Sequence, residues 1–139
     1  MKHLSVGTGS VSFRADLPDV LGELAARFEL VWATSWQDNA NLLLASVLGL
    51  PTLPVVRFTA AARERIWVGG YAGRTWKLET VARFVGDRPA AWIDDELHAD
   101  AWVWAALRAV PTKLLSPEPS VGILDRDVRA LLAFARQNG

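Results

Sequence analysis

The stretch Ala90-Ala91-Trp92-Ile93-Asp94-Asp95-Glu96 decides the fold that we expect of this chain. It follows a turn-forming segment at 86–89, and its apolar part has the length of a strand that is buried on both faces, too short for a core helix. Two adjacent carboxylates, Asp94 and Asp95, come directly after it. Because ligands of open α/β sheets bind beyond the carboxyl ends of the strands, this pair predicts a cation site. The alternative is a surface loop of solvated acids.

Composition limits the classes of protein that the chain can represent. A length of 139 residues predicts a single domain over 1–139 with a substantial core. The 15 basic and 15 acidic residues balance, so no charge excess favours nucleic acid or an anionic membrane as partner. The chain has no cysteine and only two histidines, which excludes thiolate metal sites and disfavours histidine-built ones. With neither a membrane-length apolar run nor a signal-peptide core, the sequence predicts a soluble, cytoplasmic protein.

Strand-like and helix-like segments alternate along the chain. This alternation predicts an α/β fold of three layers, with a mostly parallel sheet covered by helices on both faces. We expect a loop at 7–10, a short extended piece at 11–13 and a small hairpin or cap-like insertion at 59–75. The expected strands are 30–33, 53–58, 90–93 and 112–115, and the expected helices begin at Asp16, near Asp38, at Trp76-Lys77, at Ala99 and at Asp125.

Two further polar residues lie at places comparable to that of the acidic pair. Thr34 ends the expected strand 30–33, where its hydroxyl could donate to a phosphoryl oxygen or else cap the helix that follows. Lys77 stands at a helix start, where the helix dipole disfavours a cation unless an anion is held nearby. The alternative for Lys77 is a solvated surface lysine. Glu96 and Asp100 are expected to be surface or capping groups.

The three positions together indicate phosphate chemistry. Asp94 and Asp95 offer the hard oxygen ligands that Mg²⁺ takes when it bridges to a phosphate. A hydroxyl, a lysine and a carboxylate pair together would stabilise the charges of a phosphoryl group in transfer. Along this chain the threonine comes first, the lysine second and the acids third. Response-regulator receivers, which use the same residue types, have the acids first.

The stretches 28–36, 49–56 and 86–96 are similar to small, uncharacterised actinobacterial proteins of the haloacid dehalogenase-like (HAD) hydrolase superfamily. The resemblance runs from about Val11 to the last helix. It implies a Rossmann-like sheet and a magnesium-dependent phosphatase. It assigns Thr34 to the second motif, Lys77 to the third, and Asp94 and Asp95 to the fourth. In the family the hydroxyl and the lysine bind the phosphoryl group and the fourth-motif acid helps to hold Mg²⁺, with Asp94 the preferred direct ligand here.

The first motif of that family is missing from the sequence. It is a central strand ending in Asp-x-Asp, which supplies the nucleophile and the general acid and base. No acidic residue precedes Asp16 in this chain. We therefore expect a fold without its first central strand and a 139-residue form that is inactive or weakly active. We favour a natural chain that extends upstream; the alternative is a degenerate member whose gap is filled by segment 7–13 or by a partner subunit.

Two functional hypotheses follow. The first is a magnesium-dependent phosphohydrolase of the HAD type that acts on a phosphorylated small molecule or a phosphoprotein. The second is a non-catalytic module on the same fold that binds a phosphorylated ligand or another protein. Exposed strand edges would favour a homo-oligomer. A third reading, an α/β domain whose polar groups have no function, explains the order of the motifs least well.

Overall fold

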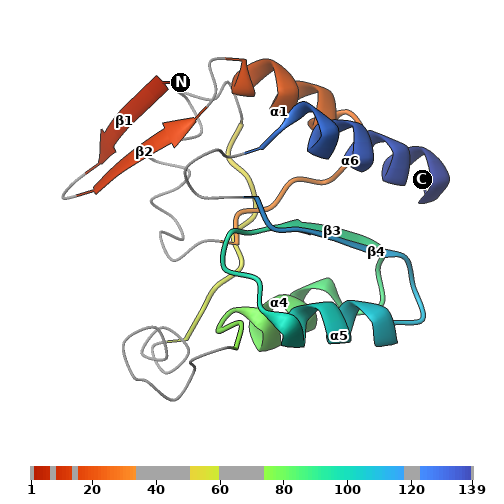
Figure 1. Ribbon diagram of the computed structural model, residues 1–139. Coiled ribbons are helices and arrows are strands. Elements are labelled where there is room, and N and C mark those ends of the chain that lie inside the picture. Colours follow the sequence, from red (N-terminus) through yellow and green to blue (C-terminus); the bar gives the residue numbers. More distant parts are fainter. Residues whose placement is uncertain are drawn as a thin grey trace.

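The computed structural model describes residues 2–6, 9–13, 16–33, 51–59, 74–117 and 123–138 (Figure 1). The described part is a mixed α/β structure. The expected helix at 38–48 lies outside the described residues, as does most of the expected insertion at 59–75. The elements in chain order are β1 (Lys2–Val6), β2 (Gly9–Phe13), α1 (Leu17–Ala25), α4 (Leu78–Val85), β3 (Ala90–Ile93), α5 (Ala99–Leu107), β4 (Thr112–Leu115) and α6 (Asp125–Asn138).

Strands β3 and β4 form a parallel pair joined by helix α5. Their register runs from Ala90 opposite Thr112 to Ile93 opposite Leu115. A parallel pair requires a crossover connection, and α5 supplies it. The expected strands 90–93 and 112–115 are confirmed with these bounds.

A second parallel contact joins the expected strands 30–33 and 53–58. It consists of one bridge between Trp32 and Val55. The backbone N–H of Trp32 donates to the carbonyl oxygen of Pro54 at 2.9 Å, and the N–H of Val56 donates to the carbonyl oxygen of Trp32 at 2.8 Å. Pro54 itself has no N–H to give, which limits the ladder on this side. Within the described residues, this pair is not hydrogen-bonded to β3 or β4.

The first thirteen residues contain an antiparallel hairpin that the sequence pattern did not predict. Strand β1 pairs with β2 from Lys2 opposite Phe13 to Val6 opposite Gly9. The expected loop at 7–10 is therefore wrong for Gly9 and Ser10, which belong to β2. The low strand propensity of the serine and glycine residues in these segments is the reason why the local sequence did not indicate two strands. Segment 9–13, suggested above as a filler of the central gap, pairs with β1 instead.

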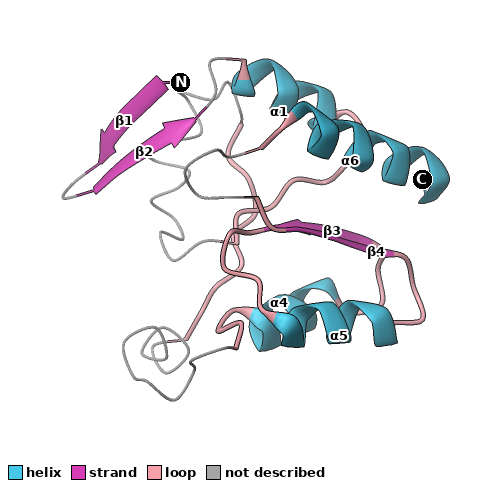
Figure 2. Cartoon of the chain, viewed as in Figure 1, coloured by secondary structure: helices cyan, strands magenta, loops and turns pink. Residues whose placement is uncertain are grey.

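Helices cover both faces of the β3–β4 pair. Figure 1 and Figure 2 show α1 and α6 together on one face and α4 and α5 together on the other. Successive side chains of β3 lie on opposite faces of the sheet, as in any pleated strand. Trp92 belongs to the cluster on the α4–α5 face, whereas Ala91 and Ile93 pack against the cluster on the α1–α6 face.

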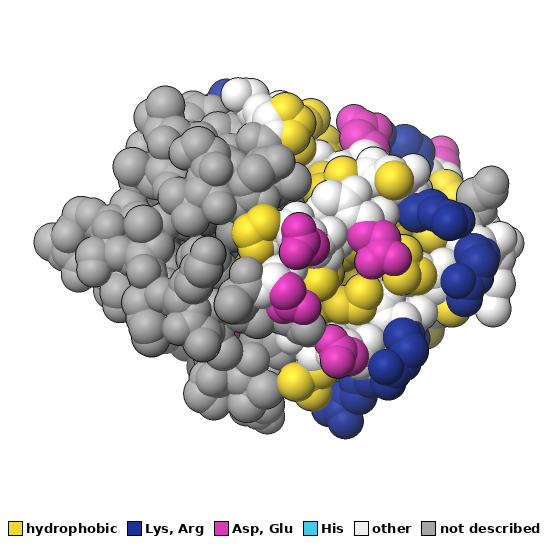
Figure 3. Space-filling view, turned by 90° about the horizontal axis from the view of Figure 1, so that it is seen from above, with side chains coloured by type: hydrophobic (Ala, Val, Ile, Leu, Met, Phe, Trp, Pro, Cys, Tyr) yellow, Lys and Arg dark blue, Asp and Glu magenta, His cyan; other side chains and the backbone are white. Residues whose placement is uncertain are grey.

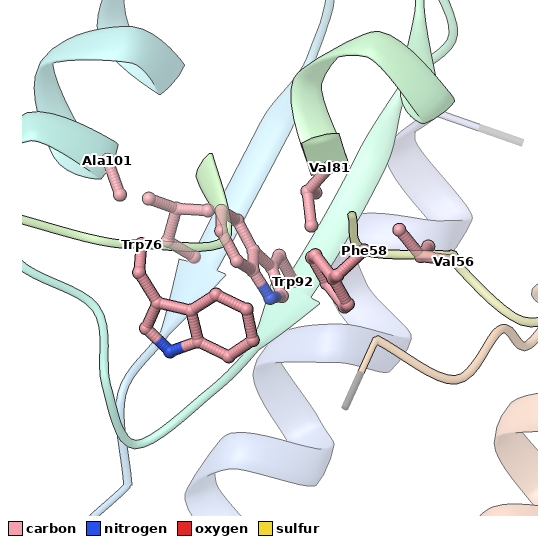
Figure 4. Packing of buried hydrophobic residues seen from close by; sticks show 7 residues of the cluster. Val56, Phe58, Trp76, Val81, Trp92 and Ala101 are labelled. Carbon is pink, nitrogen blue, oxygen red and sulfur yellow. The ribbon is translucent and has the colours of Figure 1, made fainter. Parts of the chain in front are cut away.

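Two hydrophobic clusters make up the described core. The cluster beneath α4 and α5 is rich in aromatic rings (Figure 4), with the centroids of Phe58 and Trp76 4.9 Å apart. Its buried members are Val56, Phe58, Trp76, Val81, Trp92, Ala101 and Leu114. The cluster beneath α1 and α6 contains Val20, Leu24, Val128 and Leu131. The buried apolar residues of the first and last helices therefore face the same part of the core.

One buried donor in the first cluster has no acceptor. The indole N–H of Trp92 is buried and makes no hydrogen bond to any residue in the described part of the chain. Such a group costs about 1–3 kcal/mol relative to a satisfied one.

The outer surface of α1 and α6 is mixed in character. Figure 3 shows acidic and hydrophobic side chains side by side on this face, with basic side chains gathered toward one end. Among the described residues, no helix has the length and apolar character needed to cross a membrane.

Candidate functional site

A buried ion pair joins the start of helix α4 to the end of strand β3. The Nζ atom of Lys77 lies 2.6 Å from Oδ2 of Asp94, and the two side chains are only 10% and 5% exposed. The other carboxylate oxygen of Asp94, Oδ1, accepts a hydrogen bond from the backbone N–H of Glu96 at 2.9 Å. Neither the surface-lysine reading of Lys77 nor the surface-loop reading of Asp94 holds.

The position of Lys77 at a helix start required an anion close by. Asp94 is an anion in the required position, and it comes from the chain itself. Lys77 is the residue before the first turn of α4, and Gly86, with a positive φ of 59°, ends the same helix. Glycine adopts that backbone conformation without strain, which lets the chain turn directly into β3. The eight-residue helix and the four-residue strand thus bring together two residues that lie 17 positions apart.

Asp95 is the second carboxylate of the predicted pair and is exposed. Partial burial raises its pKa, and repulsion from Asp94 and Glu96 raises it further. Negative charge is therefore concentrated at the carboxyl end of β3, and a bound cation would relieve it.

A second polar cluster lies immediately before Lys77. Thr75 is 3% exposed, and its backbone N–H donates to both carboxylate oxygens of Asp100 at 3.1 and 3.0 Å. Its hydroxyl donates to Oδ1 of Asp100 at 2.7 Å and accepts from the backbone N–H of His98 at 2.8 Å. Asp100 also accepts from the backbone N–H of Ala101 at 2.9 Å. The cluster ties the segment that carries Lys77 to the first turn of α5.

The Thr75–Asp100 contact sets the protonation of Asp100. Burial alone raises the pKa of this carboxyl, but the hydrogen bonds from Thr75 and from the N–H of Ala101 outweigh it. The net pKa lies below the ordinary value. Asp100 is thus held as a carboxylate that accepts four hydrogen bonds, and it is more than the surface or capping group expected from the sequence.

Glu96 also has a definite partner. Its Oε2 atom accepts a hydrogen bond from the indole N–H of Trp76 at 2.8 Å. Trp76 is a core residue, and the Nζ of Lys77 lies 5.5 Å from the centroid of its ring. Trp76 is therefore part of the core and also a neighbour of the ion pair.

A shallow cavity of about 300 Å³ opens between α4 and α5, beside the Thr75–Asp100 contact. It does not include Lys77 or Asp94, so the ion pair lies outside it. The polar groups of Thr75 and Asp100 in its wall already bond to each other. Its lining residues are Arg74, Thr75, Trp76, Leu78, Glu79, Ala82, Asp100 and Trp104.

No family model, curated protein or solved structure matches this chain. The HAD resemblance therefore stays a prediction from the sequence stretches quoted above.

Three of the four predicted site residues are described. Lys77 and Asp94 are in contact, and Asp95 follows Asp94 in the chain. Thr34 lies outside the described residues. Sequence reasoning missed the role of Thr75 and Asp100, because no spacing rule connects two residues 25 positions apart.

The acidic residues fit Mg²⁺ in type but are few. Among the described residues, no group of three or more histidine, cysteine, aspartate or glutamate side chains could hold a metal ion. A carboxylate offers about four acceptor positions, and Asp94 uses one for Lys77 and one for Glu96. Mg²⁺ is commonly held by one or two carboxylates with waters and a phosphate completing its shell, which Asp94 and Asp95 could provide.

Proposed function

We propose that this chain is a phosphate-binding domain of the HAD hydrolase type, related to magnesium-dependent phosphatases. The observation that carries the proposal is the contact between Lys77 and Asp94 at the carboxyl end of a parallel strand. The resemblance assigns these two residues to the third and fourth motifs, and their contact supports that assignment.

We also infer that the two parallel pairs belong to one Rossmann-like sheet with a gap between segment 30–33 and β3. The hydrophobic clusters support this layout. Val31 and Ala33 pack against the cluster that contains Trp92, and Leu30 packs against the cluster that receives Ala91 and Ile93. The two segments thus share the same two helical faces, as neighbouring parts of one sheet do.

The chemistry proposed for the site is charge stabilisation. The ammonium group of Lys77 would bind a phosphoryl oxygen, shared with or released from Asp94, and the hydroxyl of Thr34 would donate to another. Asp94 and Asp95 would hold Mg²⁺, which neutralises charge on the phosphoryl group when it is bound. The Thr75–Asp100 contact positions the backbone before Lys77 and so directs the ammonium group toward Asp94.

The covalent mechanism of the HAD family uses an aspartate nucleophile on a strand before the first helix, and none of the first fifteen residues is acidic. We therefore propose that the 139 residues bind a phosphorylated small molecule or phosphoprotein with little or no turnover. A phosphohydrolase would require an Asp-x-Asp strand in the central gap. The cytoplasmic location expected from the sequence stays a prediction.

A non-catalytic module is the second candidate, and one observation favours it. Lys77 is already paired with Asp94, an anion of the same chain. An ion pair of this kind can have a purely structural role, or it can dissociate only when one specific ligand binds. As a non-catalytic module, the domain recognises a phosphorylated ligand or a protein and performs no reaction.

A phosphatase assay combined with a binding assay separates these candidates. Hydrolysis of p-nitrophenyl phosphate is measured with Mg²⁺ and with a chelator, and inorganic phosphate binding is followed by ³¹P NMR on the same samples. We expect phosphate binding that depends on Mg²⁺, with turnover at the level of the buffer blank. Turnover that Asp95→Asn reduces would show that the 139-residue form is itself an enzyme. Absence of phosphate binding would contradict a phosphate site and leave only a module that binds another protein.

A further inference from the structure

Helix α5 has a second apolar face that points away from the core. Its residues Ala99, Trp102, Val103, Ala106 and Leu107 are all exposed. Trp102 is 48% exposed, Val103 57% and Leu107 81%. Their spacing of three and four residues puts them on one side of the helix, the pattern by which one helix packs on another.

The opposite side of α5 is already used by the core. Ala101 is fully buried, and Trp104 and Ala105 pack against the cluster beneath the helix. The only charged residue within α5 is Asp100, which is held by Thr75. A helix that is apolar all round is normally covered on all sides. In the described part of this chain, the outer stripe of α5 is left uncovered.

We propose that the outer stripe of α5 (Ala99, Trp102, Val103, Ala106 and Leu107) binds the same stripe of a second copy of this chain. The two helices would run antiparallel across a two-fold axis near Val103, the middle residue of the stripe. The stripe has no charge that would repel its copy. Ala99 and Ala106 leave room for the larger side chains Trp102 and Leu107 of the other helix.

Charge at the two ends of α5 favours a second copy in this orientation. Asp95 and Glu96 are exposed just before the helix begins. Arg108 ends it, and its guanidinium donates to the carbonyl oxygens of Gly86 and Arg88. An antiparallel pair sets the acidic end of each copy against the basic end of the other. A parallel pair would set like charges together.

The size of the stripe sets the expected strength of association. Two large and three small side chains expose on the order of a few hundred Å², the scale at which an apolar patch marks an interaction site. A stable interface covers roughly 800 Å² per partner, so the stripe alone falls short of that. We expect a dimer that dissociates on dilution. This inference does not depend on the proposed phosphate site.

Sedimentation equilibrium of the full chain over a wide range of concentrations tests the proposal. The wild-type protein is expected to move from monomer to dimer as concentration rises. Leu107→Glu and Trp102→Glu, each at an exposed position, should leave a folded monomer at every concentration. Ala25→Glu is the matched control, at an exposed position of α1 on the other face of the sheet. This variant should dimerise as the wild type does.

Disulfide cross-linking tests the orientation, since the natural chain contains no cysteine. Val103→Cys should form a covalent dimer under mild oxidation much faster than Ala99→Cys, because only a parallel pair would set residue 99 opposite its own copy. A wild-type protein that stays monomeric, or a dimer that survives Leu107→Glu, overturns the proposal. A different association, such as capture of an unrelated protein by a monomeric chain, would overturn it too. Equal cross-linking by the two cysteine variants overturns the antiparallel arrangement.

Discussion

The Nζ atom of Lys77 contacts Oδ2 of Asp94 at 2.6 Å, inside the structure and at the carboxyl end of β3. Two charges are taken out of water together at this point. Their mutual attraction must offset the loss of hydration of both, so each side chain depends strongly on the other. The pair is either the resting state of a phosphate site or a purely structural contact, and substitutions distinguish these roles.

Lys77→Met should destabilise the protein markedly, because it leaves the Asp94 carboxylate buried without a counter-ion. Losses of about 3–5 kcal/mol in the free energy of unfolding are typical when one partner of a buried pair is removed. Chemical denaturation followed by tryptophan fluorescence measures this loss. Arg83→Met, on the exposed face of the same helix, is the control and should cost far less.

A double-mutant cycle isolates the interaction itself. The double variant Lys77→Met with Asp94→Asn removes both charges and should be clearly more stable than the sum of the two single losses predicts. Additive losses would show that the two side chains do not depend on each other, against the contact described here.

The Thr75–Asp100 contact should contribute to stability independently of the ion pair. Thr75→Val keeps the shape of the side chain but removes the hydroxyl, leaving Asp100 without one hydrogen bond and the N–H of His98 without its acceptor. We expect a loss of about 1–3 kcal/mol in the free energy of unfolding, measured by urea denaturation. Thr80→Val, in the middle of α4, is a control for the chemical change. A loss no larger than the control's would count against the role given to the contact.

Asp100 should make the protein sensitive to acid. Its pKa in the folded protein is lowered from the ordinary value of 3.8. Its contribution to stability is therefore complete above the unfolded pKa and is lost as the pH falls through the folded one. Asp100→Asn should flatten the fall in stability below about pH 4. Comparing the wild type with Asp100→Asn removes the contributions that other titratable groups make to the pH dependence of stability. One of these groups is Asp95, whose raised pKa changes stability with pH in the opposite direction. If the stability of the two proteins falls in parallel as the pH drops below about 4, Asp100 does not have the lowered pKa that the structure indicates.

The unpaired indole N–H of Trp92 makes a paired comparison possible. Trp92→Phe removes a donor that has no acceptor, which partly offsets the cost of the smaller ring. Trp76→Phe makes the same change at a residue that is equally buried but loses the hydrogen bond to Glu96. Thermal unfolding should show the smaller loss for Trp92→Phe. The reverse order would mean that the N–H of Trp92 has an acceptor in solution.

Much of the fold was readable from local pattern. The turn at 86–89 and the apolar run 90–93 defined β3, and Gly86 ended the helix before it. The last helix was expected to begin at Asp125, and α6 begins there. The β1–β2 hairpin was not readable, because its strands are rich in serine and glycine and are held by their mutual backbone pairing.

The site was readable in its residue types but less so in its contacts. The helix-dipole argument required an anion beside Lys77 and did not say that Asp94 would be that anion. The Thr75–Asp100 contact depends on how α4 and α5 pack, which no short motif encodes. Likewise, the sequence predicted a helix that begins at Ala99 but not that one apolar side of it would remain exposed.

The most direct test of the central claim is an isothermal titration of the 139-residue protein with inorganic phosphate, with and without Mg²⁺. Asp95→Asn is the test variant, because Asp95 is exposed and its substitution should leave the fold intact; Glu23→Gln, exposed on α1, is the control. The account predicts phosphate binding that Mg²⁺ strengthens and that Asp95→Asn weakens about tenfold or more, while the control binds as the wild type does. Binding that neither Mg²⁺ nor Asp95→Asn affects, or no binding at all, would contradict a phosphate site at Lys77 and Asp94.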